Sequence, residues 1–95
     1  MISVRELQLF NNVGTGNNFY AMPQGAYIVG AFIRYGSIHV SVLWDDTKPH
    51  VNRHFHCVGA FMPLNVSPGK RYWHVGTVIT DTGGDYYYYI VESEL

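Results

Sequence analysis

Short runs rich in Val, Ile, Tyr, Phe and Trp recur along the chain, and Gly, Pro, Asn and Asp separate them. No segment keeps apolar residues at the i, i+3, i+4 and i+7 positions of a helix together with a capping signal. Runs of this kind between turn-forming residues are typical of β-strands. The pattern therefore predicts seven strands, over Ser3–Phe10, Asn18–Met22, Tyr27–Tyr35, Ser37–Trp44, Arg53–Phe61, Arg71–Thr80 and Asp85–Glu92.

No linker, internal repeat or low-complexity segment interrupts these runs, so residues 1–95 are predicted to form one β domain. A chain of this length buries a single modest core. Strands that follow one another without helices between them favour antiparallel pairing. The fold class we expect is all-β, a small single-domain antiparallel β-sandwich or barrel.

The first predicted hairpin turns at Tyr35-Gly36, a two-residue loop between Arg34 and Ser37. Counting outward from this loop puts one continuously apolar face toward the core. The cross-strand pairs of that face are Ile33 with Ile38, Ala31 with Val40, Val29 with Val42, and Tyr27 with Trp44. The other face is half apolar, because it holds Ile28, Phe32 and Leu43.

The second predicted hairpin contains four consecutive tyrosines, Tyr86–Tyr89. Gly83-Gly84 suits a type I′ turn, in which both loop positions need positive φ, and a turn there pairs Ile79 with Tyr88. The resulting core face holds Trp73, Val75, Ile79, Tyr86, Tyr88 and Ile90, whereas Tyr87 and Tyr89 lie opposite, beside Tyr72, His74, Val78 and Thr80. Over the whole chain, the expected core comprises Val29, Ala31, Val40, Val42, Trp44, Phe55, Trp73, Val75, Tyr88 and Ile90.

The composition changes this picture in one respect, because only 14% of the residues are charged, against roughly 25% in typical soluble domains. So few charges indicate that a partner or a second copy covers part of the surface. The half-apolar face of the first hairpin suits that role, so we expect a homo-oligomer, most simply a two-fold dimer. The net charge of −1 argues against binding to long nucleic acid, which needs a basic surface.

Cysteine usage and the chain start bear on the compartment. The single cysteine, Cys57, cannot form an internal disulfide, which favours a reducing environment. The first ten residues carry charges at Arg5 and Glu6 and lack the apolar run of a signal peptide. No stretch has the length and apolarity of a membrane helix. These features predict a soluble cytoplasmic protein without a membrane partner.

The sequence "RHFHC" raises two possible chemistries, a metal site and a cysteine nucleophile. His54 and His56 share one strand face, where His39 or His74 could join them, but no Glu follows, so we expect polar surface histidines rather than a metal site. Cys57 falls on the opposite strand face from both histidines, which favours a small buried thiol over a nucleophile. With no paired carboxylates, phosphate loop or triad, we expect no catalytic residue, metal or cofactor, and no enzyme.

Aromatic and basic side chains support a binding role instead. Tyr72, Tyr87 and Tyr89 could stack on nucleobases, with His74 beside them. Among the basic side chains, which include Arg34 and Lys70, Arg53 and Arg71 are the preferred partners for phosphates. The alternative is a protein–protein contact, because tyrosine is enriched in interfaces.

Several short motifs resemble a family of short phage and prophage proteins of unknown function: "MPQGAYIVGAFIRYG", "VLWDD", "RHF", "VGA" and "HVGTVI". The resemblance extends from Met22 to Glu92 through a Met-Pro-x-Gly-Ala strand entry and Leu-Trp, Arg-x-Phe and Gly-Thr strands. The chain departs from that family where its members often read Val-Asp-Pro after the Trp, since Asp45–Pro49 reads "DDTKP", and in its tyrosine run. The resemblance implies a small β fold and a phage context, and it brings no catalytic residues.

Together these features predict a non-enzymatic phage-type protein that counters a host process or defence by stoichiometric binding in the bacterial cytoplasm. Sequestration of a small nucleotide-derived immune signal is the favoured hypothesis. The alternatives are an inhibitor that binds a host protein directly and a minor virion or assembly protein.

Overall fold

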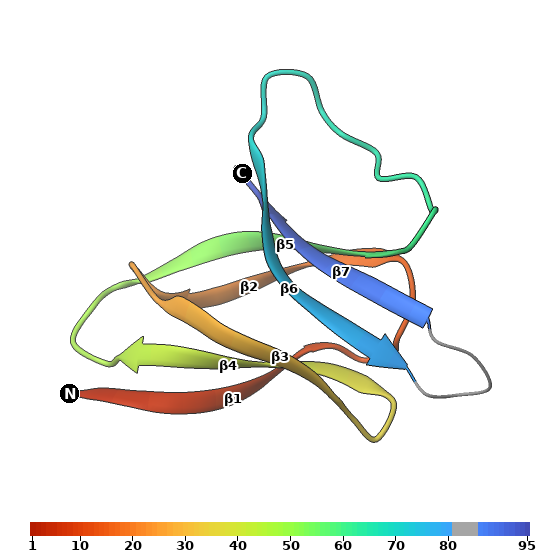
Figure 1. Cartoon of the computed structure of the whole chain (residues 1–95). Coiled ribbons are helices and arrows are strands. Elements are labelled where there is room, and N and C mark those ends of the chain that lie inside the picture. The colour runs from red at the N-terminus through yellow and green to blue at the C-terminus, as the bar shows by residue number, and fades with distance from the viewer. Residues whose placement is uncertain (81–85) are drawn as a thin grey trace.

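The computed structural model describes residues 1–80 and 86–95, with the backbone alone at Tyr86. These residues form seven antiparallel strands, close to the predicted ones: β1 (Ile2–Phe10), β2 (Gly16–Pro23), β3 (Tyr27–Arg34), β4 (Ser37–Asp45), β5 (His50–Gly59), β6 (Tyr72–Thr80) and β7 (Tyr86–Ser93). They build a three-stranded sheet of order β1-β4-β3 and a four-stranded sheet of order β2-β5-β7-β6 (Figure 1). The all-β prediction is confirmed, as a sandwich-like pair of open sheets rather than a closed barrel.

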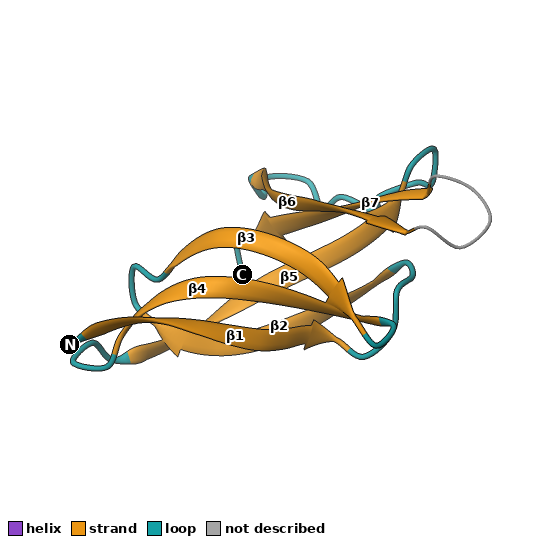
Figure 2. Ribbon diagram, turned by 60° about the horizontal axis from the view of Figure 1, so that its bottom comes forward, coloured by secondary structure: helices purple, strands orange, loops and turns teal. Residues whose placement is uncertain are grey.

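The core lies between the two sheets, which Figure 2 shows as separate layers. Strand β4 is central in its sheet, and its alternate residues Ile38, Val40, Val42 and Trp44 are all buried. The four-stranded sheet supplies the facing side chains, among them Met22, Phe55, Val78 and Ile90. Burying each such side chain contributes about 1.5–3 kcal/mol, so this layer supplies most of the stability of so small a domain.

The two sheets come closest where their edge strands β3 and β6 meet. A Cβ atom placed on Gly76 would lie 2.9 Å from the Cβ of Ala31, closer than real Cβ contacts allow. The absence of a side chain at Gly76 therefore lets β6 pack directly on β3. A small residue at position 31 serves the same purpose from the other strand.

The first hairpin has the predicted turn and half of the predicted register. Tyr35 and Gly36 have φ values of 53° and 75°, as a type I′ turn requires, and the pairing holds from Arg34–Ser37 outward as far as Gly30–Ser41. A β-bulge at Val29 then shifts the pairing, so Ile28 lies opposite Val42 and Tyr27 opposite Leu43. The predicted core position of Val29 is wrong, since the residue is 51% exposed, and Ile28, predicted on the opposite face, packs against the core.

The second hairpin keeps the predicted faces of β7 but shifts β6 by one residue. Val78 pairs with Tyr88 and Ile79 with Tyr87, because β6 ends at Thr80 and β7 begins at Tyr86. Val78 is consequently buried and Ile79 is 55% exposed, the reverse of the prediction. The predicted turn at Gly83-Gly84, its Asp81 and Asp85 flanks and the inward side chain of Tyr86 lie outside the described residues.

The prediction that Trp73 belongs to the core is also wrong, since its side chain is 43% exposed at the start of β6. A second bulge separates His74 from Gly76 in the pairing with β7. Val75, the residue within this bulge, still packs against the core as predicted, as do Ala31 and Tyr88. The errors of face at Val29 and Ile79 come instead from a bulge and from the spacing of two strands, which sequence alternation does not reveal.

Candidate functional site

The four-stranded sheet has one face toward the core and one away from it, here called the outer face. Its positions follow from the alternation of residues along the paired strands. They are Asn17, Phe19, Ala21, Asn52, His54, His56, Val58, Tyr72, His74, Thr77, Ile79, Tyr87, Tyr89, Val91 and Ser93. None of these described positions carries a carboxylate, and seven of them carry a ring.

Four of these rings form a continuous row across the sheet. Phe19 on β2 stacks on His54 with ring centroids 4.0 Å apart and planes 10° from parallel. His54 lies 4.2 Å from His56 on the same strand, and His56 lies 5.7 Å from Tyr72 on β6. The row therefore spans all four strands of the sheet, since β7 lies between β5 and β6.

Ser93 of β7 connects the two histidines through hydrogen bonds. Its hydroxyl lies 2.9 Å from Nε2 of His56 and 3.4 Å from Nδ1 of His54, whose Nε2 lies 3.2 Å from the side-chain oxygen of Asn17. The Asn17 oxygen only accepts, so Nε2 of neutral His54 donates to it and Nδ1 accepts from Ser93. The Ser93 hydroxyl in turn accepts from Nε2–H of His56.

Both histidines have a pKa below the usual value. Burial is the main cause for His54, and the charge of Lys70 adds to it. Burial is also the main cause for His56, followed by the charges of His54 and Lys70. At neutral pH both imidazoles are therefore neutral, which agrees with the hydrogen-bond directions around Ser93.

Four of the six predicted ligand-binding residues lie on the outer face: Tyr72, His74, Tyr87 and Tyr89. Tyr87 and Tyr89 are 42% and 37% exposed, which confirms the predicted outward orientation, while Tyr88 between them is partly buried. The hydroxyl of Tyr72 accepts a 2.7 Å hydrogen bond from the backbone N–H of Ser67. His74 lies 2.9 Å from the hydroxyl of Thr77 through Nε2.

Arg53 lies on the core side of β5, away from the other predicted ligand-binding residues. Its guanidinium donates two 2.6 Å hydrogen bonds to the carboxylate of Glu92 and a third, also 2.6 Å, to the carbonyl of Ala26. The indole N–H of Trp73 donates to the same carboxylate at 3.1 Å. Glu92 is buried, so this network joins β5, β6 and β7 to the start of β3 and leaves Arg53 with its charge neutralised.

Arg71 lies at the end of the outer face, immediately before β6. Its guanidinium Nε lies 3.3 Å from the carboxylate of Glu94, and its backbone N–H donates to the same carboxylate at 2.7 Å. That backbone hydrogen bond is the main reason why the pKa of Glu94 is lowered. Neither predicted arginine is therefore free of a carboxylate partner.

The two catalytic chemistries weighed on the sequence find no further support. Cys57 is buried, as predicted, and burial raises the pKa of its thiol to about 11, so it is not a thiolate at neutral pH. Among residues 1–80 and 86–95, no three or more His, Cys, Asp or Glu side chains are grouped so that they could hold a metal ion. The same residues contain no helix that could cross a membrane.

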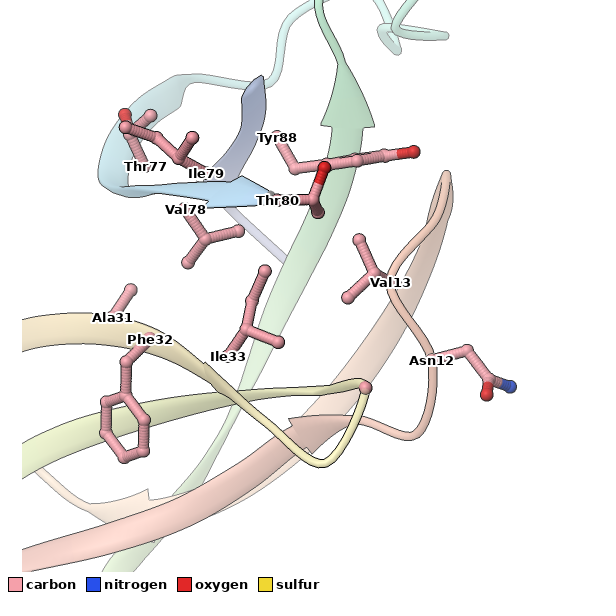
Figure 3. Close-up of a pocket in the computed structure, with 11 residues that line it drawn as sticks. Asn12, Val13, Ala31, Phe32, Ile33, Thr77, Val78, Ile79, Thr80 and Tyr88 are labelled. Atoms are coloured by element: carbon pink, nitrogen blue, oxygen red, sulfur yellow. The ribbon is translucent and has the colours of Figure 1, made fainter. Parts of the chain in front are cut away.

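A groove of about 940 Å³ lies elsewhere, beside the seam between β3 and β6 (Figure 3). Val13, Ile33 and Val78 point into it, whereas Phe32 points away. Its described lining residues carry no charged side chain. A phosphorylated ligand would find no cation among these lining residues, so for such a ligand the outer face is the better candidate.

Sequence reasoning did not identify Phe19 as a member of this row, nor Asn17 and Ser93 as hydrogen-bond partners of its histidines. Phe19 lies within a predicted strand, whereas Asn17 lies just before the predicted start of that strand and Ser93 just beyond the predicted end of the last one. Their proximity to His54 depends on the pairing of β5 with both β2 and β7, strands far away in sequence. The spacing of His54 and His56 was the one available signal.

The fold and this face define a small two-sheet β protein with an aromatic, histidine-containing surface. No family model, no curated protein and no solved structure matches the chain. The resemblance to short phage proteins therefore stays a prediction.

Proposed function

We propose that the protein is a non-enzymatic, phage-type binding protein that counters a host process by holding a small nucleotide-type ligand stoichiometrically on its outer face. The observation that carries this proposal is the row of rings from Phe19 to Tyr72, flanked by the exposed Tyr87 and Tyr89 and without a carboxylate among the described outer-face positions. Planar bases stack on such rings irrespective of their identity.

The energetics favour a ligand with more than one base. Each base that stacks on an aromatic side chain contributes about 1–3 kcal/mol, so one contact alone gives weak binding. A dinucleotide, linear or cyclic, can use two rings of the same face. A dinucleotide carries few phosphates, so a protein of net charge −1 can bind it, whereas such a protein is poorly suited to long nucleic acid.

The experiment is a calorimetric titration of the purified protein with mononucleotides and cyclic dinucleotides, combined with native mass spectrometry of the complex. We expect saturable binding with a fixed stoichiometry and recovery of unchanged ligand after denaturation. Replacing both Tyr87 and Tyr89 by Ala should weaken binding, whereas Tyr27→Ala, at an exposed tyrosine of the other sheet, should not. Absence of binding at millimolar ligand, or conversion of the ligand, would refute the proposal.

A second candidate, direct inhibition of a host protein, is favoured by the groove beside β3 and β6. Both strands are edges of their sheets, so each has only one hydrogen-bonded neighbour. An extended, uncharged segment of a partner could add to either edge and place its side chains among the apolar residues that line the groove. Hydrogen exchange that slows in β3 and β6 when a host protein is added would support this candidate.

A further inference from the structure

The predicted phosphate-binding arginines leave the outer face without their charges, because Glu92 neutralises Arg53 and Glu94 neutralises Arg71. Arg34, on the other sheet, is likewise paired with Glu6 at 2.6 Å. A nucleotide held on the outer face needs another group of donors for its phosphate. The described residues near the histidine pair supply one.

The charge of Lys70 acts on both histidines of this pair, since it contributes to the lowered pKa of His54 and of His56. Lys70 is the last residue of a turn, and its backbone N–H donates to the carbonyl of Ser67 at 3.3 Å. Gly69, within this turn, has a φ of 82°, as such a turn requires. The N–H of Ser67 is fastened to the hydroxyl of Tyr72 at 2.7 Å. The turn that carries Lys70 is thus fixed to the end of the outer face through the ring of Tyr72.

Two side chains beside Lys70 retain hydrogen-bonding capacity. The Tyr72 hydroxyl accepts from Ser67, so its O–H proton is available to a ligand. His56 makes a hydrogen bond to Ser93 through Nε2, and its Nδ1 makes none with the described residues. Both nitrogens of His54 are engaged, by Ser93 and Asn17, so His54 orients the pair rather than offering a donor.

We propose that His56, Lys70 and Tyr72 form a subsite for a phosphate group, with the neighbouring rings of the outer face stacking on the base attached to it. When an anion binds, Nδ1 of His56 takes up a proton and donates a charge-assisted hydrogen bond, alongside the Lys70 ammonium and the Tyr72 hydroxyl. Three such donors, with no carboxylate among the described outer-face positions, suit a group with several acceptor oxygens. The stacking of the base depends on the proposed function, whereas the binding of phosphate at this subsite does not.

The charges around His56 agree with this assignment. The charge of Lys70 acts on His56, and neutral His54 lies beside it. The other neighbours come from β6 (Tyr72 and His74), β7 (Ser93) and β2 (Asn17), and none of them carries a negative charge. The charge of Lys70 also lowers the pKa of Glu94, but the carboxylate of Glu94 is paired with Arg71. The lowered pKa of His56 therefore reflects burial beside a net positive charge, and an anion placed there would raise it.

The test follows the imidazole signals of His56 and His39 by NMR while pH is varied, with and without inorganic phosphate. We expect phosphate to raise the pKa of His56 by about one unit, which corresponds to about tenfold tighter binding to the protonated form. The signal of His39, which stacks on Phe32 on the other sheet, should not respond to phosphate. An equal shift of both histidines would mean only non-specific screening and would overturn the subsite.

Variants separate the subsite from the proposed function. His56→Gln keeps a donor toward Ser93 but cannot titrate, so phosphate binding should lose its pH dependence, while His39→Gln, on the other sheet, should keep it. Lys70→Gln should weaken phosphate binding by about tenfold, as expected for one charge-assisted hydrogen bond. If a nucleoside and its monophosphate bound equally well, the subsite would be wrong and the proposed function would stand. If phosphate titrated His56 but no base-containing ligand bound more tightly than phosphate, the proposed function would fail and the subsite would stand.

Discussion

Gly76 and Ala31 face each other at the closest approach of the two sheets, with room for one methyl group between them and not for two. Gly76→Ala should therefore destabilise the protein by about 1–3 kcal/mol, as for other overpacked cores. Chemical denaturation measures this change.

Gly30, on the same strand as Ala31, gives a matched control, because a Cβ there meets nothing within 4 Å. Gly30→Ala should be neutral or stabilising, by up to about 1 kcal/mol, since it restricts the unfolded chain. Adding Ala31→Gly to Gly76→Ala should recover part of the lost stability. If the two changes were simply additive, the contact between the sheets would not be the cause.

The pair of Arg53 and Glu92 should be essential for folding. Arg53→Met leaves the buried carboxylate of Glu92 without its two guanidinium hydrogen bonds, and breaking a buried pair in this way costs about 3–5 kcal/mol. Arg71→Met, which removes the exposed pair with Glu94, should cost at most about 1 kcal/mol. Thermal unfolding of the two variants compares them directly, and similar melting temperatures would contradict the structural role of Arg53.

The tyrosine run should divide into stability and binding. Tyr88 packs against the core, so Tyr88→Ala should destabilise by a large part of the about 3–5 kcal/mol that a fully buried aromatic residue contributes. Tyr87→Ala and Tyr89→Ala remove exposed side chains and should each cost about 0.5 kcal/mol or less. Calorimetric melting curves provide the measurement, and a silent Tyr88→Ala would mean that the face of β7 is misassigned.

Stability should fall on mild acidification because of the histidine pair. The folded-state pKa of His54 and His56 lies below the unfolded value of 6.5, so below that pH the unfolded chain takes up protons first. The stabilisation is fully present above pH 6.5 and is lost as pH falls through the lowered folded-state pKa. Asp45 and Glu94 do not contribute in this window, since their lowered pKa values lie under 3.8 and 4.5.

Urea denaturation between pH 7.5 and 5.5 tests this expectation. His56→Gln should flatten the dependence of the unfolding free energy on pH, because Gln does not titrate. His50→Gln, at an exposed position, serves as the control. A wild-type protein whose stability rises toward pH 5.5 would contradict the burial of these imidazoles.

Self-association should use the outer surface of the three-stranded sheet. Val4, Leu43 and Tyr27 are exposed there and lie side by side on β1, β4 and β3, so they form an apolar row. Leu43→Lys should convert a two-fold dimer into a monomer in light scattering, whereas Ile79→Lys, on the other sheet, should not. A wild-type monomer at tens of micromolar would count against this surface.

The sequence was informative where local rules decide the structure. Alternation and turn chemistry located all the described strands and the Tyr35-Gly36 turn, and they identified the buried side of β4 and the faces of β7. They failed at Val29 and Val78, where a bulge and a loop length each shifted the alternation by one residue. They could not reveal that Arg53 meets Glu92 or that His56 meets Ser93, because these contacts depend on strand order in the sheet.

The position of β7 also constrains the time at which the outer face can form. β7 follows the other three strands of its sheet along the chain but lies between β5 and β6 in space. Until it inserts, β6 has no neighbour in the sheet, and His54 and His56 lack Ser93. Pairings between strands far apart in sequence lose the entropy of a long loop before stabilising contacts form. They are therefore slow, in the range of about milliseconds to seconds. On the ribosome, the outer face would therefore form late and in a single event rather than strand by strand.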